Sequence, residues 1–163
     1  MSGGAWSGDV ARAHDHRAPT LTMRVESLRQ RGIPREVWWT QRASKDECVT
    51  SNAVGPGDFP QSLEVGPGRT VRIRLQKRHR PKDVFLTQWR GARVGEQVTL
   101  GPSSELEFDL RRQSRGTRRA WEVIFDRPDP GEYFYEISAA WSDRNGCRDE
   151  QGGFWRFSLT VGL

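Results

Sequence analysis

The segment Asp129-Pro130-Gly131-Glu132-Tyr133-Phe134-Tyr135 decides the fold class of this chain of 163 residues. A Pro-Gly turn leads directly into a stretch in which every second residue is apolar, namely Tyr133, Tyr135, Ile137, Ala139 and Trp141. Successive side chains of a strand point to opposite faces, so this alternation predicts a half-buried strand over residues 132–141. Other segments of the sequence show the same alternation next to Gly or Pro, so strands are predicted along the rest of the chain as well.

Segments of the same period are separated by Gly and Pro roughly every 8–12 residues. We expect strands at 21–26, 37–40, 70–75, 83–89, 96–100, 106–110, 121–125, 132–141 and 154–161. Gly101-Pro102 is expected to be a turn, and residues 43–62 an irregular connection. The spacing predicts an all-β fold, an antiparallel β-sandwich of about 8–9 strands. Residues 1–20 are expected to be a disordered N-terminal segment, and residues 21–163 one sandwich domain.

Aromatic residues are expected to supply much of the core, because only 34% of the residues are hydrophobic while seven are Trp. The alternation places six of them on the inward side of their strands: Trp121, Tyr133, Tyr135, Trp141, Trp155 and Phe157. Phe134 and one of Trp38 or Trp39 fall on the opposite side. They are expected to be exposed anchors for a protein or a sugar ring.

The net charge of +5 comes almost entirely from Arg, since Lys occurs only at positions 45, 77 and 82. Two segments, 77–82 and 111–119, are predicted to be basic loops, and Arg72 and Arg74 point outward between them. The candidate residues for an anionic ligand are Arg72, Arg74, Lys77, Arg78, Arg80, Lys82, Arg111, Arg112, Arg115, Arg118 and Arg119. Strict alternation of strand direction places the two loops at opposite ends, which favours local ion pairing. Arg usage in a GC-rich genome is the alternative explanation.

The two cysteines, Cys48 and Cys147, are too far apart in sequence for a CxxC motif. In a secreted domain they would form one disulfide, worth about 4–5 kcal/mol in the chain-entropy model. In the cytosol they would be two thiols. Residues 1–20 hold no secretory signal, and no apolar run approaches the roughly 20 residues of a membrane span. A cytosolic chain, a removed signal and a start inside a longer reading frame all remain open.

No catalytic motif is found in the sequence. Of three His residues only His79 lies outside the N-terminal segment, and it is expected to be a surface residue. The acidic loop around Cys147 lacks the regular oxygen spacing of a calcium site and has no His for copper. We therefore expect a non-enzyme without a catalytic residue, metal or cofactor.

The run Asp129-x-Gly131-x-Tyr133-x-Tyr135 resembles the Asp-x-Gly-x-Tyr-x-Cys signature of immunoglobulin-like sandwiches. The resemblance implies that Tyr133 bonds back to upstream backbone as a corner residue. Tyr135 stands where the signature has Cys, so the usual inter-sheet disulfide is missing.

Residues 20–162 hold a short strand, an aromatic strand near a Cys, a Pro-rich connection, a strand entry at Val65-Gly66-Pro67-Gly68-Arg69-Thr70-Val71, a hairpin at Pro130-Gly131-Glu132-Tyr133 and a final aromatic strand. This order loosely resembles the C-terminal sandwich domain of uncharacterised secreted proteins and lipoproteins of Gram-positive bacteria. These often pair two cysteines near the second strand, and only Cys48 matches. The resemblance implies an extracellular or envelope location, with a cytoplasmic one as the alternative.

Two functional hypotheses follow. The first is a non-catalytic envelope or secreted binding or structural module that contacts a protein or cell-wall partner, with Gly131, Tyr133 and Trp141 as structural residues. The alternative is a module that binds an anionic polymer, a polysaccharide or a nucleic acid, through the Arg-rich loops. Salt distinguishes them, because polyanion binding weakens steeply as salt rises.

Overall fold

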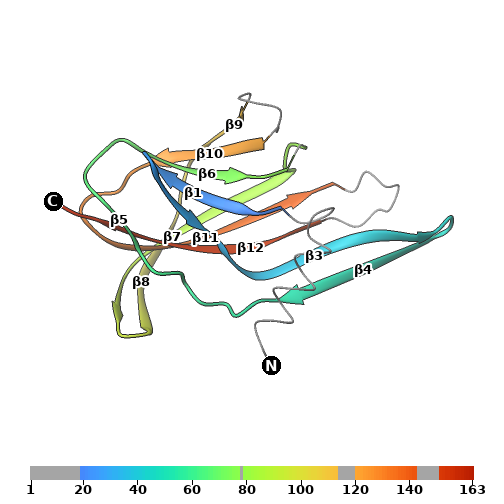
Figure 1. Cartoon of the computed structure of the whole chain (residues 1–163), viewed down its shortest axis with the longest axis horizontal. Coiled ribbons are helices and arrows are strands. Elements are labelled where there is room, and N and C mark those ends of the chain that lie inside the picture. The colour runs from blue at the N-terminus through green and yellow to red at the C-terminus, as the bar shows by residue number, and fades with distance from the viewer. Residues whose placement is uncertain (1–18, 78, 114–119, 143–150) are drawn as a thin grey trace.

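The computed structural model describes residues 19–77, 79–113, 120–142 and 151–163, and their regular structure is entirely β (Figure 1). The strands are β1 Leu21–Val25, β2 Leu28–Arg31, β3 Ile33–Ser44, β4 Glu47–Val54, β5 Leu63–Val65, β6 Thr70–Leu75, β7 Asp83–Val94, β8 Gln97–Glu105, β9 Asp109–Gln113, β10 Ala120–Asp126, β11 Gly131–Trp141 and β12 Gln151–Val161.

The fold has twelve strands, more than the 8–9 expected, and these strands form two sheets. A five-stranded sheet has the order β2-β1-β6-β10-β9. A seven-stranded sheet has the order β4-β3-β12-β11-β7-β8, and β5 also pairs with β12. All pairings are antiparallel except that of β5 with β12. The predicted all-β sandwich is confirmed.

The core lies between the two sheets and is formed by the alternating apolar residues that the sequence indicates. Trp141 and Trp155 are each 1% exposed. Of the six aromatic residues predicted to point inward, five are buried and Trp121 is partly buried against the core. The indole nitrogen of Trp141 donates a hydrogen bond to the backbone oxygen of His79 at 2.9 Å, so its one polar group is paired.

Tyr133 makes the bond that the resemblance implies. Its hydroxyl donates to the backbone oxygen of Asp129 at 2.8 Å. Gly131 leaves room for this contact, because a Cβ atom there would lie 3.2 Å from the Tyr133 ring. The Tyr135 hydroxyl donates to the side-chain oxygen of Gln88 at 2.8 Å. Burial, with a smaller contribution from Tyr133, raises the pKa of Tyr135 far above its ordinary value.

A buried side chain fills a gap in the ladder of β12. Strand β3 pairs with β12 only as far as Arg156, and β5 pairs with it from Leu159. Between them, the backbone amide of Ser158 donates to the Gln30 side chain, and the Gln30 amide donates to the Ser158 backbone oxygen, both at 2.9 Å. Gln30 thus ties the edge of the five-stranded sheet to the larger sheet.

The edge strand β4 was not predicted, and the edge strand β8 was predicted only over residues 96–100. Residues 47–54 form β4, although residues 43–62 were expected to be irregular; most residues of this edge strand are exposed, so the sequence carries no core pattern. The expected turn at Gly101-Pro102 is also wrong, because both residues lie inside β8. Strand β8 is the other edge of the seven-stranded sheet, where a proline need not donate to a neighbour.

This second error reverses the predicted position of a basic loop. Strand β7 leads away from the end of β6, β8 returns, and β9 continues in the same direction after the chain changes sheets at 106–108. Consequently Gln113, which ends β9, and Ala120, which begins β10, lie at the end of the sheet where Leu75 ends β6. The residues that flank the two basic segments therefore share one end of the sandwich, not opposite ends.

The chain covers part of the outer face of the seven-stranded sheet with its own connection 55–62. The Phe59 ring lies 5.1 Å from the Phe134 ring and 6.2 Å from the Trp89 ring. Phe134 is 0% exposed, so its prediction as an exposed anchor is wrong. Trp38 is half-buried, 5.6 Å from the ring of Phe154.

Arginine side chains of the sheet bond the backbone of this connection, and one of them is also held by an ion pair within the sheet. The Glu136 carboxylate accepts from Arg35 at 3.0 Å and from Arg156 at 2.9 Å. The guanidinium of Arg156 also bonds the backbone oxygen of Gly57, and that of Arg93 bonds the backbone oxygen of Pro60 at 2.8 Å. These arginines therefore have partners within the fold.

Candidate functional site

The outer face of the five-stranded sheet carries a set of arginines on four of its strands. Residues directly opposite each other in a sheet point to the same side, and Met23, Ile73 and Val123 are opposite one another and buried. Their chain neighbours therefore point outward. We call the outward Arg24, Arg29, Arg31, Arg72, Arg74 and Arg111 the arginine face.

The register arranges these arginines in two rows across the strands. In the first row Arg29 on β2 is opposite Arg24 on β1, which is opposite Arg72 on β6. The row continues to Ile124 and Asp109. The second row consists, in order, of Arg31, Thr22, Arg74, Glu122 and Arg111. Three arginines in direct succession are unfavourable for the sheet, because like charges opposite each other repel.

Carboxylates of the described residues neutralise only part of this charge. Arg72 pairs with Glu122 at 3.5 Å, the two side chains being 50% and 9% exposed. Arg111 pairs with Asp109 at 3.3 Å. Within the described residues, no ion pair is found for the other four members of the face, Arg24, Arg29, Arg31 and Arg74. The Nε of Arg74 is buried without a hydrogen-bond partner there.

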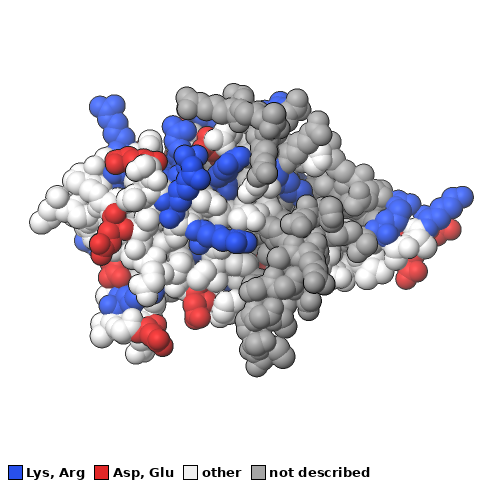
Figure 2. Space-filling view, viewed as in Figure 1, with Lys and Arg blue, Asp and Glu red and all other residues white. Residues whose placement is uncertain are grey.

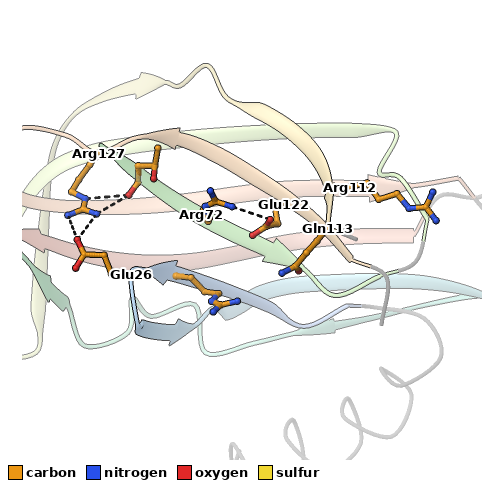
Figure 3. A pocket seen from close by; sticks show the side chains of 8 residues that line it. Glu26, Arg72, Arg112, Gln113, Glu122 and Arg127 are labelled. Carbon is orange, nitrogen blue, oxygen red and sulfur yellow. Dashed lines mark hydrogen bonds and ion pairs between the residues drawn. The ribbon is translucent and has the colours of Figure 1, made fainter. Parts of the chain in front are cut away.

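A pocket of about 500 Å³ opens on this face (Figure 3). Its lining consists of Arg24, Glu26, Thr70, Arg72, Arg112, Gln113, Glu122 and Arg127. Figure 3 shows the Arg72–Glu122 pair in the middle of the pocket, with Arg127 and Glu26 at one end and Arg112 and Gln113 at the other. The walls are polar, which suits a charged, hydrated ligand.

Arg127 has a structural role at the end of this pocket. Its side chain is only 4% exposed, and it bonds the backbone oxygens of Gly66 at 2.8 Å and Thr70 at 3.1 Å. It also pairs with Glu26 at 3.4 Å. A Cβ atom at Gly68 would collide with the guanidinium, so a larger residue there would displace the Arg127 side chain. Arg127 therefore holds the turn before β6 rather than a ligand.

The charge is visible on the molecular surface. Figure 2 shows Lys and Arg side chains gathered over the region of β10, β6 and β1, with few acidic side chains among them. Such a concentration of one sign of charge attracts anions and raises their association rate.

The predicted anion-binding residues divide into three groups. Arg72, Arg74 and Arg111 lie on the arginine face, and Arg112 lines the pocket beside it. Lys77, Arg80 and Lys82 lie at the end of the sandwich instead. Arg78, Arg115, Arg118 and Arg119 are outside the described residues.

At that end of the sandwich, the basic side chains contact the fold. Lys77 donates to Gln151 at 2.9 Å and lies 4.9 Å from the centre of the Trp141 ring. Arg80 lies 5.4 Å from the centre of the Trp121 ring, and the backbone amide of Lys82 donates to Ala140.

The sequence reasoning missed Arg24, Arg29 and Arg31. Arg24 alternates with the buried Met23 and Val25, so the rule that placed Arg72 and Arg74 outward applied to it as well. Arg29 and Arg31 flank the buried Gln30 in the same manner. Their position beside β6 depends on the pairing of β1 with β6, which local sequence does not give.

Cys48 lies on β4, opposite Arg42, and is exposed. Cys147 is outside the described residues, so the pairing of the two stays a prediction. Among the described residues, no group of three or more His, Cys, Asp or Glu side chains is placed to hold a metal ion. The described part of the chain also has no helix long and apolar enough to cross a membrane.

No family model and no curated protein matches the chain. One chain of a solved structure concerning T cell specificity and activation by the bacterial superantigen toxic shock syndrome toxin-1 is similar at 16% identity. The alignment covers 63% of this chain and 93% of the other, with a TM-score of 0.28. A likeness this weak carries no argument about function.

Proposed function

We propose that this protein is a non-catalytic module that binds an anionic polymer through the arginine face. The observation that carries the proposal is the row Arg29–Arg24–Arg72. In this row Arg24 on β1 lies directly opposite Arg29 on β2 and directly opposite Arg72 on β6. Only Arg72 of the three has a carboxylate partner among the described residues. An anionic ligand would supply the missing counter-charges.

The chemistry of the side chain supports the same ligand class. Guanidinium groups present paired donors that match phosphate, sulfate and carboxylate groups, and they stay charged at any physiological pH. Adjacent strands are about 4.8 Å apart, so the row offers three such groups within about 10 Å. A polymer with repeated charges engages several of them at once, whereas a single anion engages one or two.

The proposal is tested by the affinity for heparin as a function of salt. The slope of log K against log salt measures the number of ionic contacts, and we expect a steep loss of affinity as salt rises. The triple variant Arg24→Gln/Arg29→Gln/Arg72→Gln should lose most of the binding and flatten the slope. Lys45→Gln removes one charge from the turn between β3 and β4 and is the control for the single variant Arg24→Gln, which also removes one charge.

A result in which wild type and triple variant bind alike would reject the arginine face as the site. Circular dichroism and a melting curve for each variant separate lost binding from lost folding. Salt-independent binding would reject the ionic mechanism itself.

A protein partner remains a second candidate, and the exposed edge strand β4 favours it. Val49 and Val54 on this strand are 43% and 72% exposed. An edge strand with apolar side chains can add a strand from another chain. Sedimentation velocity of the wild type and of Val49→Lys tests whether the edge supports self-association: a loss of dimer in the variant supports it, and a wild-type monomer at high concentration argues against it.

The extracellular or envelope location and the immunoglobulin-like classification are also part of this proposal. The corner bond of Tyr133 supports the classification, and a Cys48–Cys147 disulfide would support the location. Gln151 bonds Thr40 at 3.5 Å, two residues before the partner of Cys48 on β3. Cys147 precedes Gln151 by four residues, a reach of up to about 14 Å, which makes the pairing sterically accessible. Titration of unreduced, denatured protein should find no thiol; two free thiols would favour the cytoplasm.

A further inference from the structure

We infer that the polymer bound by the arginine face is an anionic polysaccharide that crosses strands β2, β1 and β6. This inference rests on the proposed function and specifies both the ligand class and its path. Three features of the face carry it: the distribution of charge, the lack of aromatic rings and the exclusive use of arginine.

The positive charge is concentrated on one side of the sheet. Strands β2, β1 and β6 carry five of the six arginines of the face, and none of the residues of these three strands is acidic. Glu122 and Asp126 point outward from β10, and Asp109 from β9. A polyanion is therefore attracted to the first three strands and repelled at β10.

This distribution gives the path a direction. The row Arg29–Arg24–Arg72 runs across the strands, and a parallel row holds Arg31 and Arg74 about 7 Å away. Strand β2 is the edge of the sheet, so a long polymer leaves the face over β2 rather than over β9. Thr22, between Arg31 and Arg74, offers a hydroxyl that can hydrogen-bond a sugar hydroxyl.

Among the described residues, the arginine face holds no exposed aromatic platform. In the described strands of the five-stranded sheet, Phe125 is buried in the core and Trp121 packs partly against it. Proteins that bind single-stranded nucleic acids on β surfaces usually stack bases on aromatic side chains, worth about 1–3 kcal/mol for each base. Without such rings a single-stranded nucleic acid loses its stacking contacts, whereas a sugar polymer with charges and hydroxyls can use the arginines and Thr22.

All cationic residues on the face are arginine, since the three lysines of the chain, Lys45, Lys77 and Lys82, lie elsewhere. The planar fork of arginine pairs with carboxylate or sulfate through two parallel hydrogen bonds, whereas lysine acts as a point charge. The face should therefore distinguish Arg from Lys, and Arg24→Lys should bind more weakly although its charge is unchanged.

The ligand class is tested with probes of matched charge at one salt concentration. Heparin oligosaccharides represent sulfated sugars, oligogalacturonates represent carboxylated ones, and oligothymidylate and oligoadenylate represent nucleic acids. We expect at least one sugar series to bind about tenfold or more tightly than either oligonucleotide. The affinity should level off at short chain length, because the path spans only about 10 Å between the outer strands. Oligonucleotides that bind as tightly as the sugars would overturn the ligand class.

The path is tested by matched single variants. Arg24→Gln should weaken sugar binding about tenfold, the effect of losing one charge-assisted contact. Arg111→Gln, on the acidic side and already paired with Asp109, should change it less than about twofold. Glu122→Gln removes the nearest repelling charge and should tighten binding. Equal losses for Arg24→Gln and Arg111→Gln would overturn the path.

Different results would reject the proposed function and the inference about the ligand and its path. If no probe binds with salt dependence, the proposed function falls. If the oligonucleotides bind best, or binding ignores Arg24, the proposed function stands and this inference falls.

Discussion

Replacing Arg24 by Gln should stabilise the free protein at low salt, although the substitution removes a native side chain. Arg24 is directly opposite Arg29 on one side and Arg72 on the other. Each opposed like-charge pair costs roughly 0.2–1 kcal/mol, so relief of both should raise the free energy of unfolding by about 0.5–2 kcal/mol. At this chain length that gain corresponds to a rise in Tm of about 1–8 °C.

Urea titration of wild type and Arg24→Gln at two salt concentrations measures the effect. The Debye length falls from about 30 Å at 0.01 M salt to about 3 Å at 1 M, so the gain should be largest at low salt and small at high salt. Arg24→Lys keeps the charge and should gain nothing. The same Arg24→Gln protein should bind heparin more weakly, which is the opposite of its effect on stability.

Two results would refute this reasoning. A loss of stability at low salt would mean that the Arg24 side chain makes net favourable contacts on the sheet. An equal gain at both salt concentrations would attribute the effect to packing or strand propensity instead of charge. Lys45→Gln, which removes a charge in the turn between β3 and β4, should change the free energy of unfolding little in either condition.

Three further predictions concern the core. Tyr133→Phe should lower stability by about 1 kcal/mol through loss of the bond to Asp129, and an unchanged melting temperature would argue against the corner. Trp141→Ala should cost roughly 3–5 kcal/mol in a denaturant titration, and a loss below about 1 kcal/mol would mean that its ring adds little to the core. Because burial raises the pKa of Tyr135 above the ordinary value of about 10, the stability from its neutral form is present below pH 10 and is lost as pH rises above it. Tyr135→Phe should therefore lose less stability than wild type between neutral and alkaline pH, and identical pH profiles would contradict this.

The strands of the core could be predicted because one face of each is buried, which makes every second residue apolar. Residues 132–141 and 70–75 show the pattern, and both are strands that contribute to the core. Edge strand β4 and the second half of edge strand β8 show no such alternation, since neither face of an edge strand has to be apolar along its length. The proline at 102 then suggested a turn where the chain continues as an edge strand.

The candidate site was only partly within reach of sequence reasoning. Arg72 and Arg74 were placed outward by alternation, and that assignment agrees with the register. Their neighbours on β1 and β2 come from a segment about 45 residues earlier in the chain, and local patterns do not say which strands pair across such distances. Phe134 shows the same limit, because the connection that buries it comes from residues 55–62.

The most direct test of the account is a map of the backbone amides that shift when a heparin tetrasaccharide is added to isotope-labelled protein. The account predicts that the largest shifts fall on β2, β1 and β6, around Arg29, Arg24 and Arg72, and that they disappear in Arg24→Gln/Arg29→Gln/Arg72→Gln. Shifts confined to β3 and β4, or to the segment 77–82, would contradict it.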